Sequence, residues 1–509
     1  MGSDVLIVGA GPTGLALALS MAKQGVSTKI IDKAAGPGTA SRAMAVMPRT
    51  LEFYDQFGFA DEMVTESIKI ENINLYVDGK KRARMHVGSL GEGISNYTSP
   101  FSFPQDEHEK LLLKKLSSFG VTVEWNTELI SFQERQNNVT ATLQSYDETV
   151  EEVFLYVCGC DGAGSAVRQE IQADFPGGTY EEKFYVMDIK ATGKPVGSHN
   201  LSLCLRDNSF VVLLPVRSTG TTRAIGVFPP QMSMQSDAGD NEQLVSFIEK
   251  AYQLQVSDVN WFSSYNVHHR VASHFRKGRA FLVGDAAHIH SPAGGQGMNT
   301  GIGDAMNLGW KLAGVIQGKS NLKLLDTFEQ ERKSFAERLV NTTDQAFTRV
   351  VSKRLLDRVL RKQLAPVAIP FINRSNRIRQ GLFRVISQTQ ISYPNSSISK
   401  GEVGDIQAGD RLPYTKENYK SLQMVDWQVH IYGSATSKMQ HFCYENGIKL
   451  YTFSFDSIAE GKGLQKEAIY LIRPDGHIGF TNSHQDINKL KAYLDHWGII
   501  PFRKTKSNS

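Results

Sequence analysis

The chain of 509 residues is too long for one ordinary hydrophobic core, so we expect more than one domain. Hydrophobic residues make up 41% and charged residues 21%, as in ordinary globular proteins, and the formal net charge of +4 is too small for a dedicated nucleic-acid binder. Four cysteines are too few for a disulfide framework, and no apolar run approaches the roughly 20 residues that span a bilayer, so we expect a soluble protein of the cytoplasm.

The N-terminal segment has the pattern of a strand–helix–strand unit. Residues 4–8 and 26–31 are short apolar runs of the kind that form buried parallel strands, and residues 13–24 between them have helical periodicity. The N-terminus of such a helix offers free N–H groups and a partial positive charge. The unit therefore predicts an anion-binding turn at the end of its first strand.

That turn has the sequence Gly9-Ala10-Gly11-Pro12-Thr13-Gly14. In a turn of this kind one glycine allows the tight bend, one lets the backbone approach a pyrophosphate, and one lets helix and strand pack closely. Asp32 ends the second strand, where a carboxylate can accept the hydroxyls of a ribose. These features predict a bound dinucleotide, but they do not separate FAD from NAD.

The next two hundred or so residues contain two kinds of sheet pattern. Residues 109–119 are typical of an amphipathic helix and residues 121–125 of a following strand, and the alternation at 139–157 indicates an antiparallel meander. The strand-like runs between 176 and 275 indicate a second, mostly antiparallel sheet, which we expect to cover the substrate. Candidate walls of a substrate pocket, each with plain core packing as the alternative, are Phe101, Phe103, Phe210, Val212, Leu214 and Phe228.

The segment after 276 returns to the pattern of the first unit. A strand at 280–283 leads to Gly284-Asp285, where a carboxylate can bind hydroxyls of a flavin's ribityl chain. The loop at 292–299 has almost no bulky side chains, so its backbone can lie against a flat ring, and the helix at 298–315 would point its positive end at that ring. A reduced flavin is anionic at its pyrimidine end, so this arrangement favours FAD. The expected contacts here are Pro292, Gly295, Gly297, Met298 and Asn299.

Two close pairs, Cys158 with Cys160 and His288 with His290, raise the alternative of a metal or redox site. No further ligand residues complete a site beside the histidines, so we interpret both pairs as packing or hydrogen-bonding groups and predict no metal. No Ser-His-Asp elbow, P-loop or HExxH motif is evident. We assign no catalytic side chain, because a bound flavin would carry the difficult chemical step.

The C-terminal part changes character twice. Residues 322–385 are strongly helical and basic between Arg349 and Lys362, which we interpret as a charged face of packed helices, with a membrane-surface helix as the less favoured alternative. Residues 389–409 are polar and irregular, as in a linker, and from Asp410 strands and helices alternate again. A further domain is therefore expected at the C-terminus.

These segments, in this order, resemble the group A flavoprotein monooxygenases, the class of para-hydroxybenzoate hydroxylase, phenol hydroxylase and the polyketide aromatic hydroxylases. The turn at 9–14 matches the FAD-binding turn of that family. Residues 160–168 match its DG motif, which is associated with FAD and NAD(P)H, and residues 284–312 match its GD motif. The likeness is highly specific up to about residue 345 and weaker beyond.

The resemblance also identifies single residues. Arg42 resembles the flavin-adjacent arginine of the family, and Gln105 matches a glutamine that contacts FAD. Lys33 follows Asp32 where the family often has Glu-Arg, so the adenosine contacts are expected to differ. The full set of FAD contacts that we predict outside the 292–299 loop is Gly9, Gly11, Pro12, Thr13, Gly14, Asp32, Lys33, Arg42, Gln105, Asp161 and Asp285.

The implied fold is α/β: a Rossmann-like FAD-binding domain, an antiparallel β-sheet substrate domain, a helical segment and a C-terminal thioredoxin-like domain. Residues 410–413 and 470–476 carry the thioredoxin-like resemblance, although there is no CxxC and Cys443 stands alone. The expected divisions are 1–175 and 276–395 for the FAD-binding domain with its helical segment, 176–275 for the substrate domain and 396–509 for the last domain.

The resemblance implies a reaction as well. NAD(P)H, as NADPH or NADH, would reduce bound FAD, O2 would add at flavin C4a, and the hydroperoxide would hydroxylate a phenolic or polycyclic aromatic substrate in a site that excludes water. Antibiotic inactivation by the same chemistry, Baeyer–Villiger oxidation, and an oxidase or electron-transfer protein without oxygen insertion stay open. So does a nucleotide-binding scaffold without turnover. We expect no nucleic-acid or membrane partner, and a homodimer is an open alternative to a monomer.

Overall fold

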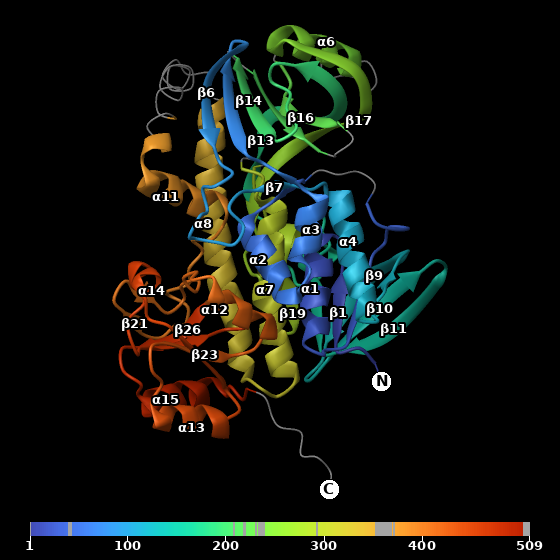
Figure 1. The fold of residues 1–509 in the computed structure, drawn as a ribbon. Helices are drawn as coiled ribbons and strands as arrows, with labels where there is room; N and C mark the ends of the chain where they lie inside the picture. The colour runs from blue at the N-terminus through green and yellow to red at the C-terminus, as the bar shows by residue number, and fades with distance from the viewer. Residues whose placement is uncertain are drawn as a thin grey trace.

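The structure is a computed structural model. It describes residues 2–38, 43–206, 209–216, 220–229, 232, 240–291, 294–351, 369 and 372–501. Three bodies of structure are visible in Figure 1: a nucleotide-binding unit in the middle, an eight-stranded sheet at one end and a C-terminal unit beside the other end. The long helix α8 (Asp326–Val351) runs past the nucleotide-binding unit from the C-terminal unit toward the eight-stranded sheet.

The nucleotide-binding unit is built on a six-stranded sheet. All of its pairs are parallel except that of β18 with β19. In spatial order the strands are β18 (Arg276–Lys277), β19 (Ala280–Leu282), β12 (Tyr156–Gly159), β1 (Val5–Val8), β2 (Thr28–Ile31) and β8 (Val123–Glu124). The central strands are apolar along their whole length because both faces of the sheet are covered.

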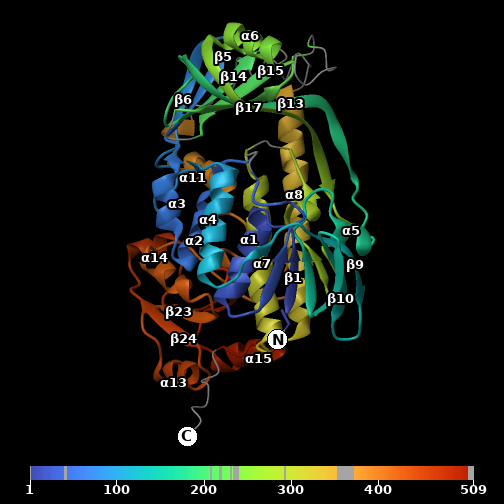
Figure 2. The same cartoon turned by 90° about the vertical axis from the view of Figure 1, so that its right-hand side faces the viewer.

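One face of this sheet is covered by helices and the other by a small sheet (Figure 2). The helices are α1 (Pro12–Lys23), α4 (Gln105–Ser118) and α7 (Gly297–Ile316), and the predicted helices at 13–24, 109–119 and 298–315 correspond to them closely. The small sheet is the predicted meander, formed by β9 (Thr127–Glu134), β10 (Val139–Ser145) and β11 (Glu148–Phe154).

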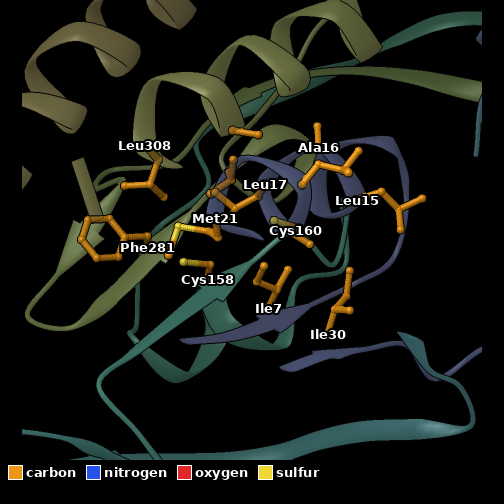
Figure 3. Packing of buried hydrophobic residues seen from close by; sticks show 14 of the residues in the cluster. Ile7, Leu15, Ala16, Leu17, Met21, Ile30, Cys158, Cys160, Phe281 and Leu308 are labelled. Carbon is orange, nitrogen blue, oxygen red and sulfur yellow. The ribbon is translucent and has the colours of Figure 1, made fainter. Parts of the chain in front are cut away.

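The core between these layers contains the close cysteine pair of the sequence analysis. Cys158 and Cys160 are buried with Ile7, Met21 and Leu308 in one large cluster (Figure 3). Burial raises the pKa of both thiols well above the ordinary value, so they stay protonated and apolar. Their contacts support packing as the reason for the pair. Among the described residues, no group of three or more His, Cys, Asp or Glu side chains is arranged to hold a metal ion.

The eight-stranded sheet is the predicted antiparallel layer, with three additional strands that come from outside residues 176–275. Its order is β20 (His288–Ile289), β17 (Leu254–Val271), β13 (Gly177–Gly193), β16 (Thr222–Val227), β15 (Ser209–Pro215), β14 (Asn200–Arg206), β5 (Asn72–Val77) and β6 (Lys80–His86). The last two come from a segment that the sequence grouped with the FAD-binding domain. β5 pairs with β14 in parallel, because it joins the sheet through a crossover rather than a hairpin.

Helix α6 (Asp240–Tyr252) covers the outer face of this sheet, and the inner face lies toward the nucleotide-binding unit (Figure 2). The predicted α/β fold with an antiparallel second sheet is confirmed. The remaining described elements of these two bodies are α2 (Pro48–Phe57), α3 (Ala60–Glu66), α5 (Ala166–Glu170), α11 (Asn376–Ile386), β3 (Ala45–Val46), β4 (Ile68–Lys69), β7 (Phe101–Ser102), η1 (Gly284–Ala286) and η2 (Leu322–Leu325).

The C-terminal unit has a mixed four-stranded sheet in the order β24 (Lys449–Phe453), β23 (Gln428–Tyr432), β25 (Ile469–Ile472), β26 (Ile478–Asn482). Its helices are α12 (Glu417–Lys420), η4 (Ser421–Met424), α13 (Ser437–Glu445), α14 (Ser457–Gly461) and α15 (Ile487–Trp497), and β21 (Glu402–Val403) pairs with β22 (Ile406–Gln407). The thioredoxin-like classification and the domain boundaries stay predictions. Cys443 is buried in α13, and burial raises its pKa to about 12.

The basic stretch between Arg349 and Lys362 lies outside the residues whose side chains the structure describes. Elsewhere, no described helix has both the length and the apolar character that a bilayer crossing requires.

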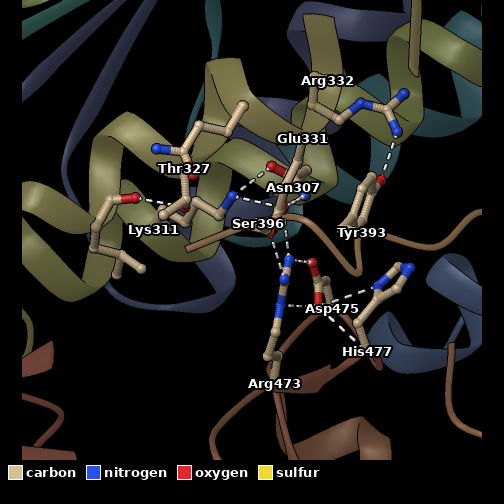
Figure 4. A network of polar contacts seen from close by, with 12 residues as sticks. Asn307, Lys311, Thr327, Glu331, Arg332, Tyr393, Ser396, Arg473, Asp475 and His477 are labelled. Atoms are coloured by element: carbon tan, nitrogen blue, oxygen red, sulfur yellow. Dashed lines mark hydrogen bonds and ion pairs between the residues drawn. The ribbon is translucent and has the colours of Figure 1, made fainter. Parts of the chain in front are cut away.

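A buried ionic cluster joins the C-terminal unit to the nucleotide-binding unit (Figure 4). Glu331 of α8 accepts hydrogen bonds from Lys311 of α7 at 2.8 Å and from both terminal nitrogens of Arg473 at 2.7 and 3.0 Å. Arg473 also pairs with Asp475 at 2.6 Å. All four side chains are almost completely inaccessible. Burial alone would raise the pKa of Glu331, but Arg473 and Lys311 hold it well below its ordinary value.

Glu331→Gln should destabilise the whole protein, because it leaves Lys311 and Arg473 buried without their counter-charge. The expected loss of unfolding free energy is about 3–5 kcal/mol. Thermal and urea denaturation of the variant would measure it. Glu337→Gln is the matched control, since Glu337 is exposed on the same helix, and it should unfold like the unchanged protein. Equal stability of the two variants would contradict the assigned role of the cluster.

Candidate functional site

The three sequence motifs meet at one edge of the parallel sheet. β19, β12 and β1 are neighbours and run in the same direction, so their carboxyl ends lie side by side. The turn at 9–14 follows β1, the DG segment at 160–165 follows β12, and the Gly284-Asp285 turn follows β19. Loops at the carboxyl ends of parallel strands are where open α/β sheets bind their ligands. The expected convergence of distant segments is therefore present.

The first two motifs touch through glycine backbone. Gly9 has a φ of +102°, and a Cβ there would overlap the carbonyl of Cys160. A Cβ on Gly14 would overlap the carbonyl oxygen of Gly9 and would lie 3.3 Å from Cβ of Cys160. These two glycines therefore let α1 begin directly against β1 and β12, as the motif predicts.

Thr13 of the first motif packs closely against the third motif. A Cβ on Gly284 would lie 2.7 Å from Oγ1 of Thr13, and a Cβ on Gly301 would overlap the same oxygen. Thr13 thus fits between the turn after β19 and helix α7. Arg168 of α5 connects the other pair of motifs, because its Nη1 donates to the carbonyl oxygen of Ala286 at 2.9 Å and its Nη2 to that of Ala163 at 2.6 Å.

The fit of this edge to a dinucleotide rests on Gly11 and on the start of α7. A Cβ on Gly11 would meet no other described atom within 4 Å, so this backbone can be approached closely by a ligand. Thr300 N–H donates to the carbonyl of Gln296 as the first intrahelical bond of α7, which leaves the N–H groups of Gly297, Met298 and Asn299 without intrahelical acceptors. Both places suit the negative charges of FAD.

The carboxylate of Asp32 is where the motif predicts it, at the end of β2. Its Oδ2 accepts from the N–H of Ala10 at 2.7 Å and its Oδ1 from that of Ala34 at 2.9 Å. The oxygens keep lone pairs for ribose hydroxyls, because a carboxylate has about four acceptor positions. The side chain of Lys33 points to solvent and pairs loosely with Glu128 at 3.6 Å.

Gln105 begins α4 and is bonded to Ala43, two residues before β3. Its backbone N–H donates to the carbonyl of Ala43 at 3.0 Å, and its Nε2 donates to Glu109 at 2.8 Å. Glu109 also accepts from Gly38 N–H at 3.0 Å, so Gln105 and Glu109 contact the described residues Gly38 and Ala43. Arg42 and Pro292 lie outside the described residues, and their contacts with FAD stay predictions.

Several predicted FAD contacts make protein contacts that were not foreseen. Oδ2 of Asp161 accepts from the N–H groups of Ala166 and Val167 at 2.7 and 3.2 Å and thereby caps α5. Asn299 uses its side chain to tie α7 to the 45–50 segment, accepting from Met47 N–H at 2.8 Å. Asp285 is an exposed residue of its turn.

The six candidate pocket residues are not brought together. Val212 and Leu214 alternate with Val211 and Leu213 along β15, so the two pairs face opposite sides of the sheet. Val211 and Leu213 pack under α6, whereas Val212 and Leu214 pack with Met44 on the inner face.

The other four candidates have mixed surroundings. Phe210 shares the strand face of Val212, but its ring packs edge to face with that of Phe184, with the ring centroids 6.5 Å apart. Phe228 packs with Tyr185 in the cluster under α6, on the outer face. Phe101 and Phe103 belong to the core of the nucleotide-binding unit. The inner-face pair is therefore the part of the set best placed to line a pocket.

Sequence reasoning missed the residue that anchors the third motif. Asp304 of α7 is fully buried and accepts from the N–H of Gly284 at 3.0 Å, from Nε2 of His288 at 2.7 Å and from Nε of Arg332 at 2.5 Å. The hydrogen bond to Asp304 accounts for the buried imidazole of His288 without a metal ion. Nδ1 of His290 is 2.8 Å from the carbonyl oxygen of Ser291. The available signal was the single acidic residue of α7, whose mean composition is apolar.

Gly11→Val should weaken FAD binding by at least about tenfold while the protein stays folded, because the new side chain enters space that only a ligand needs. Flavin absorbance per protein after dialysis and the FAD dissociation constant would measure this. Gly461→Val is the control, since Gly461 also has open space around it and lies in the C-terminal unit. Unchanged FAD binding by the Gly11 variant would refute the assigned turn.

Comparisons with known proteins agree with this geometry. A family described as "FAD binding domain" matches residues 2–343. The 6-methylpretetramide 4-monooxygenase of Streptomyces rimosus is 32% identical over an alignment that covers 98% of this chain and 94% of the relative. The pentachlorophenol 4-monooxygenase of Sphingobium chlorophenolicum is 28% identical, covering 70% of this chain and 66% of the relative.

A solved structure shows the same fold over nearly the whole chain. The flavin-dependent monooxygenase PieE, determined in complex with FAD and substrate, has a TM-score of 0.80 at 19% identity and covers 95% of this chain and 96% of its own. The predicted resemblance, the FAD cofactor and the class of FAD-dependent monooxygenase are confirmed by these findings taken together. The chain belongs to the FAD-binding domain family.

Proposed function

We propose that this protein hydroxylates a phenolic or polycyclic aromatic substrate with FAD, NAD(P)H and O2. The observation that carries the proposal is the meeting of three glycine-containing turns at one sheet edge, below an apolar sheet face. The two curated relatives act, by their names, on 6-methylpretetramide and pentachlorophenol, which supports a cyclic organic substrate here. We also propose that the protein acts in the cytoplasm.

The residues of the sheet edge would bind and orient FAD. Gly11 gives the pyrophosphate access to backbone N–H groups at the start of α1, and Asp32 is placed to accept ribose hydroxyls. Asp285, on the exposed side of its turn, is placed for the ribityl chain. The first turn of α7 would face the pyrimidine end of the ring, where its free N–H groups stabilise negative charge. When bound, FAD supplies the transfer of electrons from NAD(P)H to O2.

The inner face of the eight-stranded sheet would hold the substrate and exclude water. Its apolar patch consists of Met44, Leu201, Val212, Leu214, Val216 and Ile225. Met44 belongs to the same segment as Ala45, whose carbonyl accepts from Asn299 at the start of α7 at 2.7 Å. The patch is therefore continuous with the place where the flavin ring is expected. An apolar site of this kind excludes water and so protects reactive intermediates of oxygenation from decay.

The test of the function is substrate-stimulated turnover. Purified protein with FAD is mixed with NADPH or NADH and a panel of phenols, quinones and polycyclic aromatics, and the products are analysed by mass spectrometry. We expect at least one compound to speed NAD(P)H oxidation and to yield a product heavier by one oxygen. NAD(P)H oxidation that no compound accelerates, with peroxide as the sole product, would identify an oxidase instead. An antibiotic tested beside this panel that is oxygenated and thereby loses its antibacterial action would identify an inactivating enzyme.

Leu214→Ala should change the Michaelis constant for the aromatic substrate by several-fold, because it removes contact area from the inner face. Leu213→Ala is the matched control, since its side chain lies one position away under α6. The control should lower the unfolding free energy by about 2–5 kcal/mol and leave the Michaelis constant almost unchanged. Steady-state kinetics and thermal denaturation of both variants distinguish the two faces, and the opposite pattern would place the pocket elsewhere.

A further inference from the structure

We propose that Asp304 is a positioning residue that, through Arg332 and Tyr393, couples the docking of the C-terminal unit to the Gly284-Asp285 turn. The coupling gives the C-terminal unit a role in holding FAD. The identity of the ligand at the turn rests on the proposed function.

The first step of the coupling is the contact of Asp304 with the turn. One carboxylate oxygen, Oδ2, accepts from both the N–H of Gly284 and Nε2 of His288, at 3.0 and 2.7 Å. These residues flank Asp285, the predicted contact of the ribityl chain. Because Asp304 is completely buried within α7, these two bonds fix the turn relative to the helix whose N-terminus we expect to face the ring.

The second step passes from Asp304 to Arg332 of α8. Nε of Arg332 donates to Oδ1 of Asp304 at 2.5 Å, and its Nη2 donates to the carbonyl of Thr300 at 3.2 Å. A Cβ on Gly303 would lie 3.3 Å from the guanidinium, so a glycine at this place lets the arginine lie against α7. Burial alone would raise the pKa of Asp304, but Arg332 and His288 hold it below the ordinary value, so the carboxylate stays charged.

The third step passes from Arg332 to the C-terminal unit through Tyr393. Nη1 of Arg332 donates to the phenol oxygen of Tyr393 at 2.7 Å (Figure 4). The ring of Tyr393 lies against His477, with ring centroids 4.9 Å apart, and the guanidinium of Arg473 lies 5.7 Å from its centroid. Both of these residues are completely or almost completely buried in the C-terminal unit.

The continuous chain of contacts distinguishes this coupling from simple attachment. Glu331, next to Arg332 in the sequence, binds Arg473 and Lys311 and would hold the units together without reaching the Gly284 turn. Arg332 instead has one donor on Tyr393 and another on the carboxylate that binds the turn. A buried guanidinium is held strictly in one geometry by such paired donors, so displacement at one end changes the other.

The experiment compares Asp304→Asn, Tyr393→Phe and the double variant with Tyr493→Phe as the matched control. Tyr493 is also a buried tyrosine, and its phenol donates to the carbonyl of Ile398 at 2.7 Å, but it lies on α15 and is not bonded to Arg332. Each tyrosine variant therefore loses one buried hydrogen bond made by a phenol group, but only Tyr393 is bonded to Arg332. Amide hydrogen exchange of residues 280–291 in the full chain, with and without added FAD, reports the turn directly, and titration with FAD gives the dissociation constant.

We expect Asp304→Asn to raise the FAD dissociation constant by at least about tenfold and to speed exchange of the 280–291 segment. Tyr393→Phe should raise the FAD dissociation constant by about threefold and also speed exchange of this segment. The double variant should raise the constant by less than the product of the two single effects, because both substitutions act through the same series of contacts. Tyr493→Phe should leave both readouts unchanged.

The proposal is overturned if Tyr393→Phe leaves both the dissociation constant and exchange at 280–291 at the values of the unchanged protein, or if Tyr493→Phe alters them equally. It is also overturned if the effects of Asp304→Asn and Tyr393→Phe multiply independently. Failure of the unchanged protein to bind FAD would contradict the proposed function instead, and exchange without FAD would still decide whether Tyr393 is coupled to the turn.

Discussion

The close approach of backbone to backbone at the edge of the parallel sheet is the constraint on which the rest of the structure depends. Gly9 and Gly14 leave no room for a Cβ, and Gly284 and Gly301 leave room for Thr13 only because they have no side chain. Loops from three strands can then lie within contact of one another at the ends of β1, β12 and β19. Gly11, by contrast, is surrounded by open space. The same residue type thus serves close packing at four positions and ligand access at one.

The helices behind this edge are held by buried charge. Asp304, Glu331 and Asp475 are each paired with arginine or lysine, and burial of such groups is costly unless every charge is matched and hydrogen-bonded. The benefit is geometric specificity, since the Lys311–Glu331 and Arg332–Asp304 pairs fix α7 and α8 in one relative position. That position determines where the N-terminus of α7 points. Because the cluster includes residues of the C-terminal unit, we infer that this unit contributes to the geometry of the flavin site.

The positions of the binding turns could be predicted from the sequence because each turn has a local pattern of residues. The turn at 9–14, the acid at 32 and the Gly284-Asp285 turn each follow an apolar strand directly, so their places at the sheet edge followed from chain order and the parallel arrangement. The alternation along β15 likewise showed that Val212 and Leu214 share a face. It did not show which face is covered by α6, and for that reason Phe228 was grouped with residues of the other side.

Contacts between elements far apart in the chain could not be read from local patterns. The partners of Asp304 are 20, 16 and 28 residues away, and they meet only after α7 and α8 pack. Likewise, β5 and β6 join the eight-stranded sheet from a segment more than a hundred residues earlier, a pairing that depends on the topology of the whole chain. Asn299 and Asp161 stay predicted FAD contacts, and their side chains make protein contacts that the motifs do not specify.

A crystal structure of the full chain grown with FAD would test the central claim most directly. The account predicts the pyrophosphate against Gly11 at the start of α1 and the isoalloxazine ring between the N-terminus of α7 and the apolar inner face that includes Leu214. FAD bound away from the ends of β1, β12 and β19, or no FAD in crystals grown with an excess of it, would contradict it.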